Sequence, residues 1–135
     1  MQVPNPDGCQ KKILFVLIIT KLYVLKLAVL SPVRLVGGRW KGEGRVEIFF
    51  LGKWGTICHD KWDIDDAHVV CRQLGFSGAV SAPGSAHFGG GRGQIWLDDV
   101  DCSGSEKSIL KCRHNGWGRH RCNHDEDASV ICSSK

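Results

Sequence analysis

Cysteine content constrains this 135-residue chain more than any other feature of its sequence. Six of its seven cysteines fall in the last 78 residues, and the seventh, Cys9, stands alone near the start. An even set of cysteines in a short chain is typical of a disulfide-bonded domain in an oxidising compartment. We therefore expect three disulfides, for which the residues alone leave 15 pairings open. The six are Cys58, Cys71, Cys102, Cys112, Cys122 and Cys132.

The length and composition predict one compact domain with a short appendage, which disfavours a two-domain enzyme. The net charge of +4 comes mostly from the start of the chain, because residues 33–135 carry 14 basic and 13 acidic residues. No run of five or six basic residues is present. The charge pattern therefore disfavours nucleic-acid binding, and sequence-specific binding in particular.

Residues 13–30 form an apolar stretch that follows Lys11 and Lys12. This pattern is typical of a secretory signal peptide or a signal-anchor. A buried amphipathic helix or a non-native start of the chain are the alternatives, and Lys21 and Lys26 make a bilayer-spanning helix less favourable. We predict a leader over residues 1–32 and a domain over residues 33–135. If the leader is retained, its apolar stretch is the only expected contact with a membrane. Cys9 then lies outside the disulfide framework.

From Val33 onward, short segments rich in β-branched and aromatic residues alternate with glycine-rich turns, which predicts hairpins and a curved antiparallel sheet in an α+β fold. Residues 76–94 hold six glycines and are predicted to form a long surface loop. The predicted strands are Val33–Val36, Val46–Phe50, Trp54–Cys58, Ile95–Val100 and Ala128–Cys132.

One main helix is predicted between Asp63, a suitable N-cap, and Gly75. Its apolar residues recur at helical spacing, which directs Cys71 toward the core. A second, short helix is predicted after the capping-box pattern that joins Ser103 to Glu106. The apolar positions of the main helix are Ala67, Val70, Cys71 and Leu74.

Several stretches, in order, resemble the scavenger receptor cysteine-rich domain, and the resemblance covers residues 33–135. The six-cysteine pattern is similar to the group A form of that family. The resemblance implies a curved antiparallel β-sheet cradling one main α-helix, with disulfides Cys58–Cys122, Cys71–Cys132 and Cys102–Cys112. The matching stretches are VRLVGG at Val33–Gly38, GRVEIFFLGKWGTIC at Gly44–Cys58, WDIDDAHVVCRQLG at Trp62–Gly75, FGGGRGQIWLDDVDCSGSE at Phe88–Glu106 and NHDEDASVIC at Asn123–Cys132.

The same resemblance implies an extracellular ligand-binding module of a secreted or membrane-anchored protein, found in scavenger receptors and mucosal defence proteins, with no catalysis. The implied ligands are polyanionic or microbial, such as microbial surface polymers and sulfated glycans. An adhesion module for a cell-surface protein is the alternative. The residues agree on the lack of catalysis, because no nucleophile elbow, zinc-protease motif or P-loop is present.

Some family members hold Ca²⁺ in an acidic cluster, and the corresponding positions here are His59, Asp60 and Glu106. His59 replaces an expected aspartate. Because Ca²⁺ prefers six to eight oxygen ligands, this change lowers the expected affinity unless Asp63, Asp65 or a carbonyl group compensates. The alternative is that these acidic residues only cap helices.

Two cationic regions are candidates for anionic ligands. Arg45 and Lys53 lie in Gly44–Trp54, which resembles a bacteria- and polyanion-binding segment of the family, although the strand pattern is also explained by folding alone. The second region lies near Trp117, and its guanidinium groups are suited to sulfate, phosphate or carboxylate. It contains Arg113, His114, Arg119, His120 and Arg121.

A zinc site drawn from Cys112, His114, Cys122 and His124 is the remaining alternative for these residues. Its spacing matches no familiar zinc finger, and the two cysteines are better used in disulfides in a secreted chain.

Overall fold

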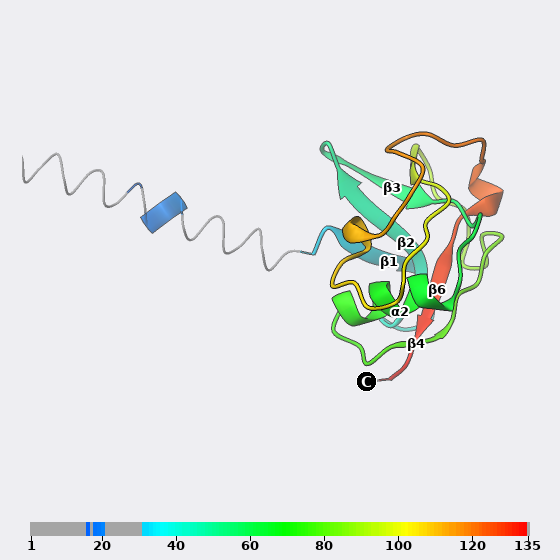
Figure 1. The fold of residues 1–135 in the computed structure, drawn as a ribbon, viewed down its shortest axis with the longest axis horizontal. Coiled ribbons are helices and arrows are strands. Elements are labelled where there is room, and N and C mark those ends of the chain that lie inside the picture. The colour runs from blue at the N-terminus through cyan, green and yellow to red at the C-terminus, as the bar shows by residue number, and fades with distance from the viewer. Residues whose placement is uncertain (1–15, 17, 21–30, 135) are drawn as a thin grey trace, which may run out of the picture. The chain divides into compact units, whose positions relative to one another are not determined.

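The computed structural model describes Val16, residues 18–20 and residues 31–134. From Pro32 onward the chain forms one compact unit, shown in Figure 1. Its elements are β1 (Val33–Gly37), β2 (Glu43–Phe50), β3 (Lys53–Ile57), α2 (Ile64–Gln73), β4 (Ala79–Ser81), β5 (Gln94–Leu97), the 3₁₀ turns η1 (Ile109–Lys111) and η2 (His124–Glu126), and β6 (Ser129–Cys132).

The predicted leader of residues 1–32 lies almost entirely outside the described residues, as does Cys9. Its role as a signal or anchor therefore stays a prediction. Within the part of the chain that the structure describes, no helix is long and apolar enough to cross a bilayer.

The strands form one mixed sheet in the order β4-β6-β2-β3-β5, with β1 also paired to β2. All its pairs are antiparallel except β3 with β5, which run parallel. The predicted α+β fold, with a curved sheet and one main helix, is confirmed, and the predicted antiparallel pairing is wrong only for β3 with β5. A parallel pair needs a long crossover, and the connection from β3 to β5 contains α2, β4 and residues 82–93, which we call the glycine-rich loop.

Helix α2 begins and ends where its sequence predicts. The Asp63 carboxylate accepts hydrogen bonds from the backbone amides of Asp65 and Asp66, and Asp66 bonds back to the Asp63 amide. Gly75, just past the end, has a φ of +96°, a conformation that favours glycine. The helix packs beside β6 and β4, as Figure 1 shows, and its buried residues join the apolar face of β2 in one core.

One local prediction is wrong, and a second is wrong in its boundary. Residues 76–94 are not a loop throughout, because Ala79–Ser81 pairs with β6 as the edge strand β4. The predicted second helix is present as the short 3₁₀ helix η1, but it begins at Ile109 with Ser108 as its N-cap, later than the sequence indicates. The Ser103 amide donates to Glu106 within a tight turn that precedes this helix.

Three disulfides hold the unit together, and they join the pairs that the family resemblance implied. Cys58–Cys122 and Cys71–Cys132 link residues 64 and 61 positions apart, whereas Cys102–Cys112 closes a local loop of 10. Cys71 faces the core from α2 as predicted, and its bridge fixes that helix to β6.

Candidate functional site

The carboxyl ends of β3 and β5 meet at one edge of the sheet because these two strands run parallel. Asp60 follows β3 after two residues, and Asp98 and Asp99 follow β5 directly. Oxygens of the three carboxylates lie within 4.8 Å of one another. Burial raises the pKa of Asp98 above its usual value of 3.8, and the charges of Asp99 and Asp60 raise it further, although a hydrogen bond from the Asp99 amide opposes this.

These carboxylates line a cavity of about 580 Å³, which we call the first cavity. Its opposite wall comes from the segment between η1 and η2, which is tied to β5 and to the residue directly after it by two backbone hydrogen bonds. The Asn115 amide donates to the Asp98 carbonyl at 3.1 Å, and the Gly118 amide donates to the Trp96 carbonyl at 2.8 Å. The residues lining this wall are Asn115, Gly118, Arg119, His120 and Arg121.

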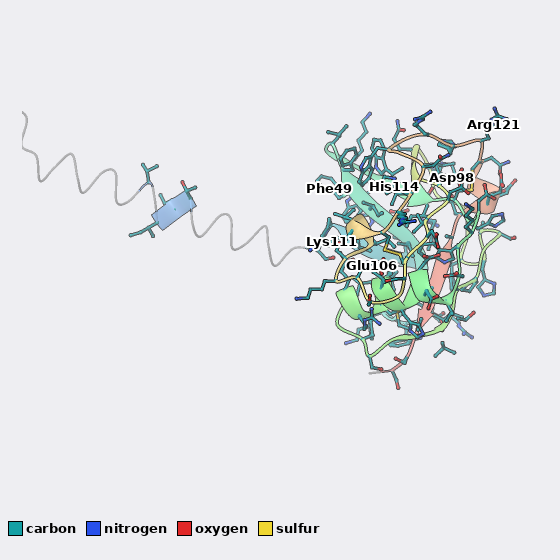
Figure 2. The ribbon with its side chains drawn as sticks, viewed as in Figure 1. Phe49, Asp98, Glu106, Lys111, His114 and Arg121 are labelled. Atoms are coloured by element: carbon teal, nitrogen blue, oxygen red, sulfur yellow. A yellow bond between two sulfur atoms is a disulfide. The ribbon has the colours of Figure 1, made fainter. Side chains whose placement is uncertain are left out.

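Arg119 and Arg121 are exposed at the rim of the first cavity. Among the described residues, no salt bridge involves either of them. In Figure 2, Arg121 extends outward from the segment before η2. The first cavity therefore combines a carboxylate cluster with guanidinium groups that are available to a ligand.

Arg113 and Glu106 line a second cavity, of about 410 Å³, together with Asp101 and Lys111. The Glu106 carboxylate accepts hydrogen bonds from the Ser103 amide, the Ser103 hydroxyl and the Gly104 amide. Backbone hydrogen bonds, that from Ser103 first, lower the pKa of Glu106 to about 2. Lys111 points into solvent on the other side of the domain from Arg121 (Figure 2). Of the predicted cations near Trp117, Arg113 lines the second cavity, whereas Arg119 and Arg121 line the first.

The Ca²⁺ ligands expected from the sequence are not gathered in one cluster. Asp60 lies with Asp98 and Asp99, whereas Glu106 is held in the turn at the second cavity. His59 points elsewhere, since its Nδ1 atom accepts from the Ser85 amide at 2.8 Å. Its Nε2 atom lies 3.7 Å from Glu126.

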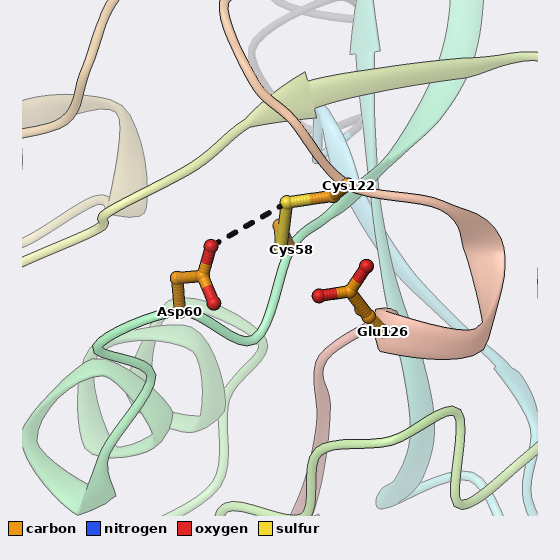
Figure 3. A group of neighbouring side chains, drawn as sticks. All are labelled: Cys58, Asp60, Cys122 and Glu126. Carbon is orange, nitrogen blue, oxygen red and sulfur yellow. Dashed lines mark hydrogen bonds between the residues drawn. A yellow bond between two sulfur atoms is a disulfide. The ribbon is translucent and has the colours of Figure 1, made fainter.

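A second group of possible ligands surrounds the Cys58–Cys122 disulfide, where Asp60 and Glu126 flank the two sulfur atoms (Figure 3). Asp60 Oδ2 lies 3.6 Å from Cys122 Sγ. The sulfurs are bonded to each other and so cannot bind a metal as thiolates. The zinc alternative is wrong for the same reason, because Cys112 and Cys122 are both in disulfides.

Arg45 is not the surface cation that the sequence suggests, because its side chain is buried. Its Nε atom donates to Glu47 at 2.9 Å, and its Nη1 atom donates to the Gly89 carbonyl at 2.9 Å. Glu47 is buried too and also bonds Arg34. Lys53, by contrast, is exposed. Of the two cations in Gly44–Trp54, only Lys53 is available to a ligand.

Sequence reasoning missed Asp98 and Asp99 as site residues. They belong to a stretch that resembles the family, but their closeness to Asp60 depends on the parallel pairing of β3 with β5. The run of two aspartates within the predicted strand Ile95–Val100 is the signal that was available; in the structure β5 ends at Leu97, and both aspartates follow it directly.

Comparison with protein families identifies the family to which the chain belongs. A model of the scavenger receptor cysteine-rich domain matches residues 36–133. The chain belongs to this family. Domains of the scavenger receptor cysteine-rich family are recognition modules, and the extracellular proteins that carry them are secreted or membrane-anchored.

Curated relatives with this domain are much longer than the chain. It is 53% identical to mouse galectin-3-binding protein and 54% identical to mouse macrophage scavenger receptor types I and II, over 77% and 78% of its own length. The matches cover 18% and 23% of those proteins. A match of 54% identity to zebrafish lysyl oxidase homolog 3B covers 72% of this chain and 12% of that enzyme homologue.

Solved scavenger receptor cysteine-rich domains share the fold. The third such domain of murine neurotrypsin is 52% identical, with a TM-score of 0.70, over 75% of this chain and 94% of that one. The domain of mouse MARCO, in a dimeric form, is 50% identical, with a TM-score of 0.64, over 74% and 93%.

Proposed function

We propose that this domain is an extracellular recognition module of the six-cysteine group A, in a secreted or membrane-anchored protein of innate defence. Its ligands are polyanions such as microbial surface polymers or sulfated glycans. Arg119 and Arg121 are the principal contacts, and Arg113 and Lys53 contribute from other parts of the surface. The three disulfides support an oxidising compartment.

The observation that carries this proposal is the pairing of exposed guanidinium groups with a carboxylate cluster in the first cavity. Arg119 and Arg121 can each hold a sulfate or phosphate group through two N–H donors. Because neither is neutralised by a salt bridge among the described residues, a ligand need not displace an internal partner.

The first cavity also fits Ca²⁺, with Asp60, Asp98 and Asp99 as the residues that would hold it. Their oxygens are the hard ligands that this ion prefers. Burial, and after it the charges of Asp99 and Asp60, raise the pKa of Asp98, and a divalent cation would offset the repulsion among the three carboxylates. A bound cation would supply positive charge between the carboxylates and an anionic ligand. We do not place Glu106 in this set, because backbone amides already satisfy its carboxylate.

Binding of the oxidised chain to dextran sulfate, with uncharged dextran as the control polymer, tests the proposal. Replacing Arg119 and Arg121 with alanine should weaken binding and reduce the slope of log affinity against log salt by about 1 for each residue. Lys41→Ala, an exposed cation outside both cavities, is the matched control. Unchanged binding by the double variant would refute the assignment.

Calcium titration in the absence of polymer tests the metal assignment separately. We expect a dissociation constant of about 10⁻⁴ to 10⁻³ M, the range of extracellular modules. Asp60→Asn should abolish saturable binding, whereas Asp125→Asn, an exposed aspartate on η2, should not. Equal titrations by both variants would contradict a site at the first cavity.

A protein partner is the second candidate, favoured by the exposed apolar tip of the β2–β3 hairpin. Phe49 and Leu51 are 46% and 77% exposed, and Phe49 packs against Trp54 at 5.2 Å between ring centroids. Exposed aromatic residues are typical of interface anchors. Binding to cells provides the test. This function would be favoured if Leu51→Ser abolishes the binding while salt and Arg119→Ala leave it unchanged.

A further inference from the structure

Asn115 and Gly116 form an Asn-Gly pair in the segment that closes the first cavity. The Asn115 side chain is exposed and lines this cavity. Glycine has no side chain to hinder approach of its backbone nitrogen to the neighbouring side-chain amide. Gly116 has a φ of +104°, and a Cβ atom there would lie 2.9 Å from Arg119 Cδ. The fold therefore favours glycine at residue 116, the position at which glycine leaves the Asn115 side-chain amide open to attack by the backbone nitrogen.

The Gly116 amide donates a hydrogen bond to His114 Nδ1 at 3.0 Å. An N–H can donate to this atom only when Nδ1 carries no proton, so the hydrogen bond assigns the neutral tautomer with its proton on Nε2. The ring is held edge-on against Trp117, 5.4 Å away, and Trp117 stacks on Phe50 at 3.8 Å. The lone pair of His114 Nδ1 therefore points at the Gly116 amide proton. Removal of that proton would make the Gly116 nitrogen a nucleophile.

We propose that Asn115 is a site of spontaneous deamidation, with His114 as the base that promotes it. His114 Nδ1 takes the amide proton as the Gly116 nitrogen attacks Asn115 Cγ. The new N–Cγ bond closes a succinimide ring, and the Cγ–Nδ2 bond breaks. The side-chain nitrogen leaves as ammonia with the proton that His114 received, and water then opens the ring to aspartate or isoaspartate.

Charged residues around the first cavity act on this step in both directions. Asp60, Asp98 and Asp99 oppose negative charge on the Gly116 nitrogen. Arg119 favours it, because its side chain packs beside Gly116 and its amide donates to the Gly116 carbonyl. The product adds one more carboxylate to a cavity that already holds three.

Isoaspartate also lengthens the backbone at residue 115 by one carbon. The Asn115 and Gly118 amides anchor this segment to the Asp98 and Trp96 carbonyls. An extra backbone atom between these anchors displaces the segment that carries Arg119. Deamidation would therefore change both the charge and the shape of the first cavity, which makes Asn115 a site of chemical ageing.

Incubation of the oxidised full chain at neutral pH, followed by peptide mapping with mass spectrometry, tests the proposal. Asn115 should convert several-fold faster in the folded chain than in the same chain reduced and denatured. Asn123, which precedes His124, is the internal control and should not be accelerated by folding. Conversion of Asn115 in the folded chain at or below the denatured rate would overturn the proposal.

His114→Ser separates the role of the base from the role of the turn. A serine hydroxyl can accept from the amide two residues on, and so keeps the local hydrogen bond, but it is not a base at neutral pH. The folded variant should lose the acceleration, while its denatured rate equals that of the parent. An unchanged folded rate would overturn the role of His114. If this variant does not fold, the folded and denatured rates of the parent still decide whether the fold promotes the reaction.

Discussion

The His124 Nδ1 atom lies 2.9 Å from Oδ2 of the fully buried Asp127 carboxylate. The other ring nitrogen lies 3.0 Å from the Gly93 carbonyl oxygen. A carboxylate and a carbonyl only accept hydrogen bonds, so the protonated ring, with two N–H donors, satisfies both. Asp127 also accepts from the Gly91 amide at 2.7 Å. Together these contacts fasten the glycine-rich loop to the start of β6.

This arrangement makes the stability of the domain depend on pH through His124. Burial lowers the pKa of His124, and Arg45 also opposes the charged ring. The hydrogen bonds to Gly93 and Asp127, with the charge of Asp127, outweigh these effects and raise the pKa above 6.5. The stabilisation is therefore fully present below pH 6.5 and is lost as pH rises through the pKa of the folded state.

Replacing His124 with alanine should lower the free energy of unfolding by about 1–3 kcal/mol near pH 5.5, and by less near pH 8.5. Urea unfolding with the disulfides intact gives the difference at each pH. His87→Ala, an exposed histidine, is the control and should show little effect. A gap between the parent and His124→Ala that does not change with pH would contradict the assigned charge state.

Arg45 and Lys53 should differ sharply in their effects, although one sequence motif contains both. Arg45→Met removes a buried cation and leaves the Gly89 carbonyl without its donor, so we expect a loss of about 3 kcal/mol. Lys53→Met, at an exposed position, should stay within about 0.5 kcal/mol of the parent. Urea unfolding measures the free energy of unfolding of both variants. Similar losses in the two variants would contradict the buried position of Arg45.

A disulfide that closes a longer loop should contribute more to stability, with a logarithmic dependence on loop length. In the chain-entropy model, the 10-residue separation of Cys102–Cys112 is worth about 2.7 kcal/mol and the 61-residue separation of Cys71–Cys132 about 4.3 kcal/mol. Paired replacement of each bridge by alanine, followed by thermal unfolding, should rank them in this order. The reverse order would indicate that strain or residual structure dominates.

Asp66 introduces a second pH dependence, below neutrality. Burial raises the pKa of Asp66 from 3.8 to about 7, despite hydrogen bonds from the Cys102 and Asp63 amides that lower it. Between pH 3.8 and about 7, Asp66 is ionised in the unfolded chain but keeps its proton in the folded domain. Stability should thus fall with rising pH, by at most about 1.4 kcal/mol per pH unit.

Asp66→Asn should flatten this dependence, since an amide does not titrate. The variant should be less stable than the parent near pH 4, because the amide nitrogen cannot accept one of the two backbone hydrogen bonds, and the gap should narrow toward pH 7. Asp65→Asn, at an exposed position in the same helical turn, should leave the slope unchanged. A constant gap between pH 4 and 7 would rule out the raised pKa.

Features with local causes could be predicted from the sequence. Helix α2 is the clearest case, because Asp63, Asp66 and Gly75 specify its ends through contacts within a few residues. The three disulfide pairings needed the family resemblance, since spacing alone left them open. The parallel pairing of β3 with β5 depends on contacts between distant segments. The closeness of Asp60 to Asp98 could therefore not be predicted from the sequence around either residue.

Arg45 shows the same limit from another direction. Strand alternation places it on the face opposite Val46, which for a sheet covered on one side means solvent. The glycine-rich loop instead folds over that face, and a Cβ atom at Gly91 would lie 2.6 Å from Thr56 Cγ2 and 3.2 Å from Arg45 Nε. Glycine is what allows the loop backbone to come this close, and the resulting burial depends on a segment more than 40 residues away.

The two long disulfides have a consequence for proteolysis. Cys58–Cys122 and Cys71–Cys132 both connect chain segments on either side of residues 72–121. A protease that nicks the glycine-rich loop therefore leaves two fragments still joined by two covalent links. The carboxylates that follow β3 and those that follow β5 would then lie on different fragments without being released from each other, so one cut should not disperse the first cavity.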